Sequence, residues 1–272
     1  MKARTGFAEV DGGRLYYEVA GEGPAVVLGH AGIADLRMWD DQVAPFAERY
    51  TVVRYDIRGF GRSPAADAPW SAHDDIAALL DHVAIGTAAV VGVSMSGAIS
   101  VDFAVTHPGR LWALVLVGAA LDGFDWGQDA EMTTADAEEV RLLEAGDIDG
   151  AVEHEVRIWV DGPRREAGHA DAAVRESVAE MQRAIYESGR NPTEHAADLD
   201  PRAITRLEEI SAPTLVLAGD ADFDGIQQIA GILASRIPGA ERAVIRNTAH
   251  VPNMERPIEF NRLVLDFLAR HA

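Results

Sequence analysis

Ser94 stands between a strand-like run and a helix-like run, in a setting that suits a nucleophile. Residues 88–91 are apolar and typical of a buried strand, residues 98–104 are typical of a helix, and Gly92 and Ser96 place small side chains two positions before and after the serine. A tight strand-to-helix turn needs small residues there, because larger ones would collide. Such a turn lifts the hydroxyl clear of the backbone and aims the first amides of the helix at one point. These amides can then stabilise an oxyanion that forms when the hydroxyl attacks a carbonyl.

Two other interpretations of this turn are kept. Ser96 occupies a position where glycine is usual, and its own hydroxyl is an alternative nucleophile, although it lies further into the predicted helix. Ser94 could also be a plain helix N-cap, a position that favours serine. The catalytic interpretation is preferred because the strand, the small neighbours and the helix occur together.

A serine nucleophile needs a base to take its proton, and the base needs an orienting acid. Asp222 follows a strand-like run at 213–219, and His250 follows another at 242–245, so the chain order is serine, aspartate, histidine. The carboxyl ends of parallel strands meet at one edge of a sheet, where these side chains would converge. Three other carboxylates are rivals for the acid: Asp220, Asp224 and Asp122.

Strand-like and helix-like segments alternate on both sides of the serine. This alternation predicts an α/β fold, with a mostly parallel twisted sheet flanked by helices. The expected strands are 16–19 (in an antiparallel hairpin), 25–28, 51–56, 88–91, 111–117, 213–219 and 242–245. The expected helices of this part are 38–48, 73–82, 98–104, 225–237 and 258–269.

The alternation stops between residues 122 and 206, where no strand-like run occurs. This stretch is acidic and has helical patterns at 135–145, 148–160 and 172–188. We expect it to be a helical cap inserted into a core domain made of residues 1–121 and 207–272. Its large apolar side chains either line an acyl or alcohol pocket or hold the cap together: Phe124, Trp126, Met132, Trp159 and Met181.

Composition narrows the function classes. The chain has 272 residues, no cysteine, and 24 basic against 44 acidic side chains, a formal net charge of −20. The absence of cysteine excludes disulfides, thiolate metal sites and a cysteine nucleophile, and the charge argues against nucleic acid or an anionic membrane surface as a partner. Residues 1–6 lead into no apolar signal region, and the longest apolar run, 111–121, is too short to cross a bilayer. We therefore expect a cytoplasmic protein whose partner is a small-molecule substrate, with the oligomeric state left open and a homodimer among the options.

Several motifs together resemble the α/β-hydrolase superfamily, and specifically its small esterase, lactonase and cofactor-free perhydrolase-like branch. The resemblance covers nearly the whole chain and rests on residues 29–32 (Gly-His-Ala-Gly), 55–63, the turn around Ser94, 219–222 and 249–250. It implies that the acid is the residue three positions after the strand-ending glycine, Asp222. It also implies that the backbone amides of Gly32 and Met95 form the oxyanion hole. His30 is expected to be structural, and Asp56 and Arg58 are expected to brace the loop beneath the turn around Ser94 by hydrogen bonds and a charge pair.

The function expected from these residues is a serine hydrolase that cleaves small to medium carboxylic esters or lactones through an acyl-enzyme. No metal or cofactor is needed for that chemistry. A carbon–carbon bond hydrolase or a perhydrolase on the same triad is an alternative. A protein that binds or senses a small ligand with little turnover is an alternative from another class.

Overall fold

The seven predicted strands and one further strand, β1, pair into one sheet in the order β1-β2-β4-β3-β5-β6-β7-β8. The computed structural model describes residues 4–272, apart from the Gln128 side chain. The pairs β1–β2 and β2–β4 are antiparallel, and the other pairs are parallel. The strands are β1 (Arg4–Val10), β2 (Gly13–Ala20), β3 (Ala25–Gly29), β4 (Thr51–Tyr55), β5 (Ala88–Val93), β6 (Leu111–Val117), β7 (Thr214–Gly219) and β8 (Glu241–Ile245).

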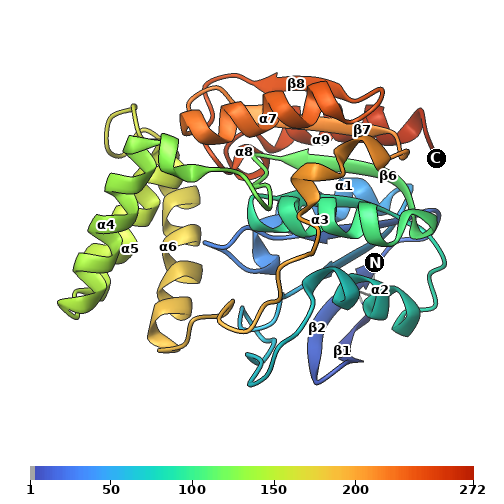
Figure 1. The fold of residues 1–272 in the computed structure, drawn as a ribbon, viewed down its shortest axis with the longest axis horizontal. Helices are drawn as coiled ribbons and strands as arrows, with labels where there is room; N and C mark the ends of the chain where they lie inside the picture. Colours follow the sequence, from blue (N-terminus) through green and yellow to red (C-terminus); the bar gives the residue numbers. More distant parts are fainter. Residues whose placement is uncertain (1–3) are drawn as a thin grey trace.

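Helices cover both faces of this sheet (Figure 1). Successive side chains of a strand point to opposite faces of the sheet. On one face, Val26 and Leu28 of β3 pack with Phe46 of α1 and Phe260 of α9. On the other face, Val27 packs in a second cluster with side chains of α2, α3 and α7. The helices of the sheet domain are α1 (Asp40–Ala47), α2 (Ala72–His82), α3 (Met95–Thr106), α7 (Asp224–Arg236), α8 (Pro252–Glu255) and α9 (Pro257–Ala269). Among the helices within residues 4–272, none is both long and apolar enough to span a membrane.

Three further helices lie between β6 and β7 in the chain and stand together at one side of the sheet (Figure 1). They are α4 (Ala130–Glu144), α5 (Ile148–Glu155) and α6 (Ala172–Glu187). Helix α4 begins five residues before the predicted start, because the Asp129 carboxylate accepts a hydrogen bond from the Met132 amide and caps it. That residues 122–206 form a separate cap domain stays a prediction.

The predicted helix at 148–160 changes type midway. Helix α5 ends at Glu155, and residues Val156–Asp161 form a π-helical turn, η4. Such wide turns are frequent at functional sites. Here the turn ends at Gly162, whose φ of 93° suits glycine.

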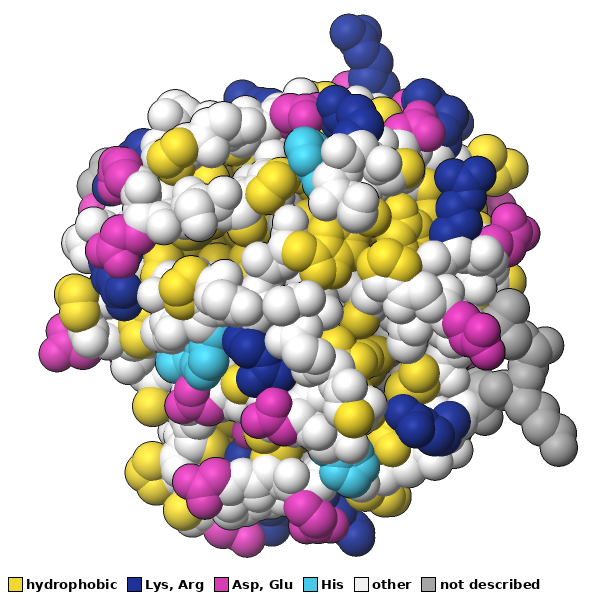
Figure 2. Space-filling model, turned by 90° about the vertical axis from the view of Figure 1, so that its right-hand side faces the viewer, with side chains coloured by type: hydrophobic (Ala, Val, Ile, Leu, Met, Phe, Trp, Pro, Cys, Tyr) yellow, Lys and Arg dark blue, Asp and Glu magenta, His cyan; other side chains and the backbone are white. Residues whose placement is uncertain are grey.

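Charged side chains of both signs are mixed over the face that lies at the right of Figure 1. Figure 2 shows Arg side chains interspersed with Asp and Glu on this face, around an apolar area. The net charge of −20 is therefore not gathered into one acidic patch there.

The loop after β4 is held by buried polar contacts. The Asp56 carboxylate accepts hydrogen bonds from the Leu36 and Arg62 amides, each at 2.9 Å, and burial raises its pKa to about 6. Arg58 forms a two-bond ion pair with Asp75 at 2.6 and 2.7 Å, with 3% and 6% of the two side chains exposed. These contacts are the bracing expected of Asp56 and Arg58.

The Arg58→Ala variant is expected to lose about 3 kcal/mol of unfolding free energy, because it leaves the Asp75 carboxylate buried without a partner. Urea denaturation followed by circular dichroism measures this loss. Arg141→Ala is the control: it removes an exposed ion pair with Glu138 and should cost less than about 1 kcal/mol. Equal losses in the two variants would contradict the bracing role.

Candidate active site

Ser94 occupies a strained turn between β5 and α3. Its φ is 55° and its ψ is −114°, a conformation that non-glycine residues rarely adopt and that often marks functional sites. The turn is tight: a Cβ at Gly92 would lie 2.3 Å from the carbonyl oxygen of Ser96. The small residue predicted before the serine is therefore required by backbone contact.

Ser96 packs inside the turn and does not face the pocket described below. Its side chain is buried, and its hydroxyl donates a hydrogen bond to the carbonyl of His30. A Cβ at Gly29 would come within 2.8 Å of the Ser96 side chain. Ser96 thus ties the turn to the end of β3, and its engaged hydroxyl is poorly placed for nucleophilic attack.

His30 holds the loop after β3 through both ring nitrogens. Its Nε2 accepts a hydrogen bond from the Ile57 amide at 3.0 Å, and its Nδ1 donates to the Ala31 carbonyl at 2.8 Å. Burial lowers the pKa of His30 to about 4, so the ring is neutral at pH 7. This arrangement matches the structural role expected for it.

The two residues whose amides are predicted to form the oxyanion hole lie close together. A Cβ added at Gly32 would be 3.9 Å from the Cβ of Met95, and both residues line the same pocket as Ser94. Met95 is the first residue of α3, so its N–H has no partner within the helix. That the two amides form an oxyanion hole stays a prediction.

His250 and Asp222 form a buried pair. The His250 Nδ1 lies 2.7 Å from Asp222 Oδ2, and each residue is only 1% exposed. The other Asp222 oxygen accepts a hydrogen bond from the Phe223 amide at 2.9 Å. Because Nδ1 faces the carboxylate, Nε2 is the nitrogen left for proton transfer.

The rival carboxylates have other partners. Asp220 accepts a hydrogen bond from the Asn247 amide, Asp224 forms an ion pair with Arg164, and Asp122 forms one with Arg202. The contacts therefore bring Asp222, rather than Asp220, Asp224 or Asp122, to the imidazole.

The loop that carries His250 is anchored by the segment after α5. The His250 amide donates to the carbonyl of Trp159 at 3.1 Å, and the two rings lie 4.3 Å apart. Glu255 accepts a hydrogen bond from the Ala249 amide at 2.6 Å and forms an ion pair with Arg165 at 2.9 Å. Burial raises the pKa of Glu255 to about 7. Sequence reasoning missed this support, because Arg165 and Glu255 are 90 residues apart.

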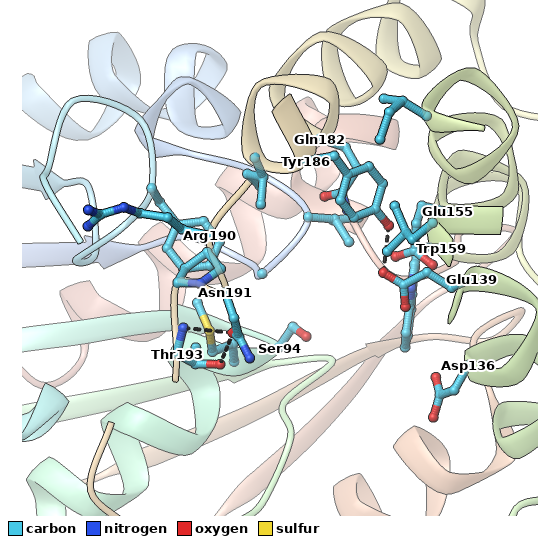
Figure 3. A pocket seen from close by; sticks show the side chains of 18 of the residues that line it. Ser94, Asp136, Glu139, Glu155, Trp159, Gln182, Tyr186, Arg190, Asn191 and Thr193 are labelled. Atoms are coloured by element: carbon cyan, nitrogen blue, oxygen red, sulfur yellow. Dashed lines mark hydrogen bonds between the residues drawn. The ribbon is translucent and has the colours of Figure 1, made fainter. Parts of the chain in front are cut away.

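Ser94 and His250 open into one pocket of about 720 Å³ beneath α4, α5 and α6 (Figure 3). Gly32 and Met95 line it from the sheet side, and Trp159 lines it from η4. Among the described residues, no hydrogen bond joins the Ser94 hydroxyl to the His250 ring. Such bonds are often long in the free enzyme and tighten when substrate binds.

Of the apolar side chains predicted to line a pocket, only Trp159 is among those that line this one. Phe124 and Trp126 line a neighbouring cavity of about 540 Å³, which Met95 also borders. Met132 is buried against Phe223, and Met181 is buried in the core cluster of α1 and α9. For the two methionines the packing favours the other expected role, holding the cap together or to the core, because their helices turn these side chains inward.

Polar residues of the three added helices line the pocket and were not predicted. They are Asp136, Glu139, Glu155, Gln182 and Tyr186. In sequence, the acidic residues are typical of a solvated helix face. The only available signal was the four-residue spacing of Gln182 and Tyr186, which places both on one side of α6.

Clusters suited to metal binding were sought in the described part of the chain. Within residues 4–272, no group of three or more histidine, aspartate or glutamate side chains is arranged to hold a metal ion.

A mostly parallel sheet, with a strained serine after a central strand and a His–Asp pair at the same edge, defines the class of α/β-fold hydrolases. The chain matches the alpha/beta hydrolase fold family over residues 24–257. It therefore belongs to the α/β-hydrolase family, and its relatives support hydrolase activity.

Individual relatives align over most of both chains. 3-Oxoadipate enol-lactonase 2 of Acinetobacter baylyi is 29% identical, covering 89% of this chain and 87% of the relative. The 2-hydroxy-6-oxononadienedioate/2-hydroxy-6-oxononatrienedioate hydrolase of Burkholderia vietnamiensis is 28% identical, covering 94% and 91%. The crystal structure of the enol-lactonase from Burkholderia xenovorans LB400 has a TM-score of 0.76 at 27% identity, covering 97% of this chain and all of that chain.

Proposed function

We propose that the protein is a serine hydrolase of small to medium carboxylic esters or lactones. The observation that carries the proposal is that Ser94, with its φ of 55°, lines the same pocket as His250, whose Nδ1 is hydrogen-bonded to Asp222. The names of two relatives, both enol-lactonases, favour the lactone or ester class.

The proposed reaction has two halves. His250 Nε2 takes the Ser94 proton while Oγ bonds to the acyl carbon, and the amides of Gly32 and Met95 stabilise the oxyanion. The bond between the acyl carbon and the leaving oxygen then breaks, and His250 gives the proton to that oxygen. Water, deprotonated by His250, attacks the acyl-enzyme and releases the acid, and the proton returns to Ser94. Asp222 stabilises the imidazolium in both halves.

A test combines covalent labelling with a substrate screen. A fluorophosphonate should add once to the protein, at Ser94, as measured by intact mass and peptide mapping, because only an activated serine reacts readily. A panel of 4-nitrophenyl esters of increasing chain length, with simple lactones, should show turnover. Prior labelling should abolish that turnover.

The same test distinguishes a hydrolase from a protein that only binds or senses a small ligand. A protein that only binds or senses a ligand would show no turnover of any ester or lactone, and would gain thermal stability with a bound compound. Absence of both labelling and turnover would contradict the proposed function.

A further inference from the structure

One side of the pocket is built from polar side chains that all carry an oxygen able to accept a hydrogen bond. Glu139 of α4, Glu155 of α5, and Gln182 and Tyr186 of α6 lie together there, and Tyr186 donates a hydrogen bond to Glu139 at 2.6 Å (Figure 3). We call these four residues the acceptor wall. Figure 3 shows them grouped apart from Asn191 and Thr193, which lie near Ser94.

The wall contains a polar atom that lacks a partner. Gln182 is 4% exposed, lines the pocket, and its side-chain oxygen accepts no hydrogen bond from the described residues. A buried unsatisfied acceptor costs about 1–3 kcal/mol. The oxygen itself is buried as placed, so a donor N–H on a bound molecule recovers that loss once the amide turns this oxygen toward the pocket.

Glu155 makes the wall responsive to a cation. It is 5% exposed, and burial, followed by the nearby Glu139, raises its pKa to about 8. Glu155 therefore holds a proton at pH 7 when the pocket is empty. A cation placed beside it would favour release of that proton and gain a charged partner.

Other charged groups around the pocket do not neutralise the wall. Asp136 lies at an exposed edge and adds negative charge. Among the described residues that line the pocket, Arg190 is the only arginine or lysine, and it forms an exposed ion pair with Asp67. Figure 3 shows Arg190 on the side of the pocket away from Glu139 and Glu155.

We infer that the pocket selects esters or lactones that carry an ammonium group away from the scissile bond, held by the acceptor wall. The inference rests on the proposed hydrolase function and adds the substrate class. The ammonium charge pairs with the carboxylates of Glu139 and Glu155, and an ammonium N–H satisfies the Gln182 oxygen when the amide turns toward the pocket. A substrate with a carboxylate at that position is disfavoured, because like charges would meet in a partly desolvated site.

The test compares 4-nitrophenyl esters that differ only at the chain end: 6-aminohexanoate, heptanoate and the monoester of heptanedioate. These place ammonium, methyl and carboxylate at the same position, and two longer chains of each type cover the depth of the pocket. For at least one length we expect kcat/KM to be about tenfold higher for the ammonium ester than for the methyl ester, and lowest for the carboxylate ester. Reactions without protein correct for spontaneous hydrolysis.

Variants of the acceptor wall test whether its carboxylates cause the preference for the ammonium ester. Glu139→Gln and Glu155→Gln should each reduce the ratio of ammonium-ester to methyl-ester kcat/KM at least threefold. Glu138→Gln is the matched control, because Glu138 neighbours Glu139 but pairs with Arg141 outside the pocket, and it should keep the preference. A preference that is absent in the wild-type protein, or unchanged in both wall variants, would overturn the inference.

The pH dependence of the preference for the ammonium ester gives a second test of the role of Glu155. Between pH 7 and 9 Glu155 loses its proton, whereas an alkylammonium keeps its charge, so the ratio of ammonium to methyl ester kcat/KM should rise with pH. Burial raises the pKa of Tyr186 above its usual value, so its hydroxyl does not titrate in this range. Burial and Glu139 also raise the pKa of Asp136, but the rise between pH 7 and 9 should vanish in Glu155→Gln if Glu155 is its source. Any effect of pH on the chemical step acts on both esters and cancels in the ratio.

A binding measurement distinguishes failure of the inference from failure of the hydrolase proposal. Isothermal titration calorimetry on Ser94→Ala compares methyl 6-aminohexanoate with methyl heptanoate. Tighter binding of the ammonium compound, lost in Ser94→Ala/Glu139→Gln, supports the wall even if the wild-type protein hydrolyses nothing. Equal binding of the two compounds contradicts the wall even if ester hydrolysis is fast.

Discussion

Ser94→Ala is expected to lower kcat for ester hydrolysis by at least about 10⁴-fold, because loss of the nucleophile removes the covalent route. Residual activity would come from the oxyanion donors at Gly32 and Met95 and from substrate binding alone. Steady-state kinetics on the best 4-nitrophenyl ester measures the loss. The fold should survive, since alanine leaves the turn's backbone contacts in place, and circular dichroism checks this.

Ser96→Ala is the matched control for this variant. It removes a hydroxyl of the same turn that is buried and bonded to the His30 carbonyl. We expect kcat within about tenfold of wild type and a loss of about 1 kcal/mol in stability, the usual contribution of one hydrogen bond. If Ser96→Ala were inactive and Ser94→Ala active, the nucleophile would be Ser96.

Asp222→Asn is expected to lower kcat by about 10⁴-fold with little change in structure. The Asp222 carboxylate accepts a hydrogen bond from His250 Nδ1 at 2.7 Å, which keeps Nε2 unprotonated and able to receive the Ser94 proton. An asparagine NH₂ facing Nδ1 would favour the other tautomer, with the proton on Nε2, and would not stabilise the imidazolium. Kinetics near pH 7, with a crystal structure of the variant, tests both points.

Carboxylates close in sequence provide the comparison for Asp222→Asn. Asp220→Asn and Asp224→Asn each remove a charge within two residues of Asp222, but these side chains contact Asn247 and Arg164 instead. Both variants should keep kcat within about tenfold of wild type. A large loss in either variant, with Asp222→Asn active, would move the acid to another residue.

Local sequence was sufficient to predict the turn around Ser94. Its requirements are short-range: an apolar strand, a small residue two positions before the serine, and a helix directly after it. The contact between Gly92 and Ser96 spans four residues, so residue size alone indicates it. The alternating strands and helices on either side are equally local, because each reflects its own pattern of apolar residues.

The type of a helix and the residues at which it ends were harder to predict from the sequence. The sequence predicted one helix over 148–160, but the chain forms α5 and then the π turn η4 (Val156–Asp161). The wider turn coincides with a contact made far away in the chain, between the Trp159 carbonyl and the His250 amide. Apolar periodicity carries no signal of such a partner.

The sequence by itself determined the nucleophile candidate, the order of serine, acid and base, and the class of sheet that brings them to one edge. Only the tertiary structure decided which of several neighbouring aspartates reaches His250, and which side chains of α4, α5 and α6 turn into the pocket. The physical reason is range: turn sterics and apolar periodicity act within a few residues. Hydrogen bonds such as Asp222–His250 and Tyr186–Glu139 join positions 28 and 47 residues apart, and they exist only once the helices have packed around the sheet.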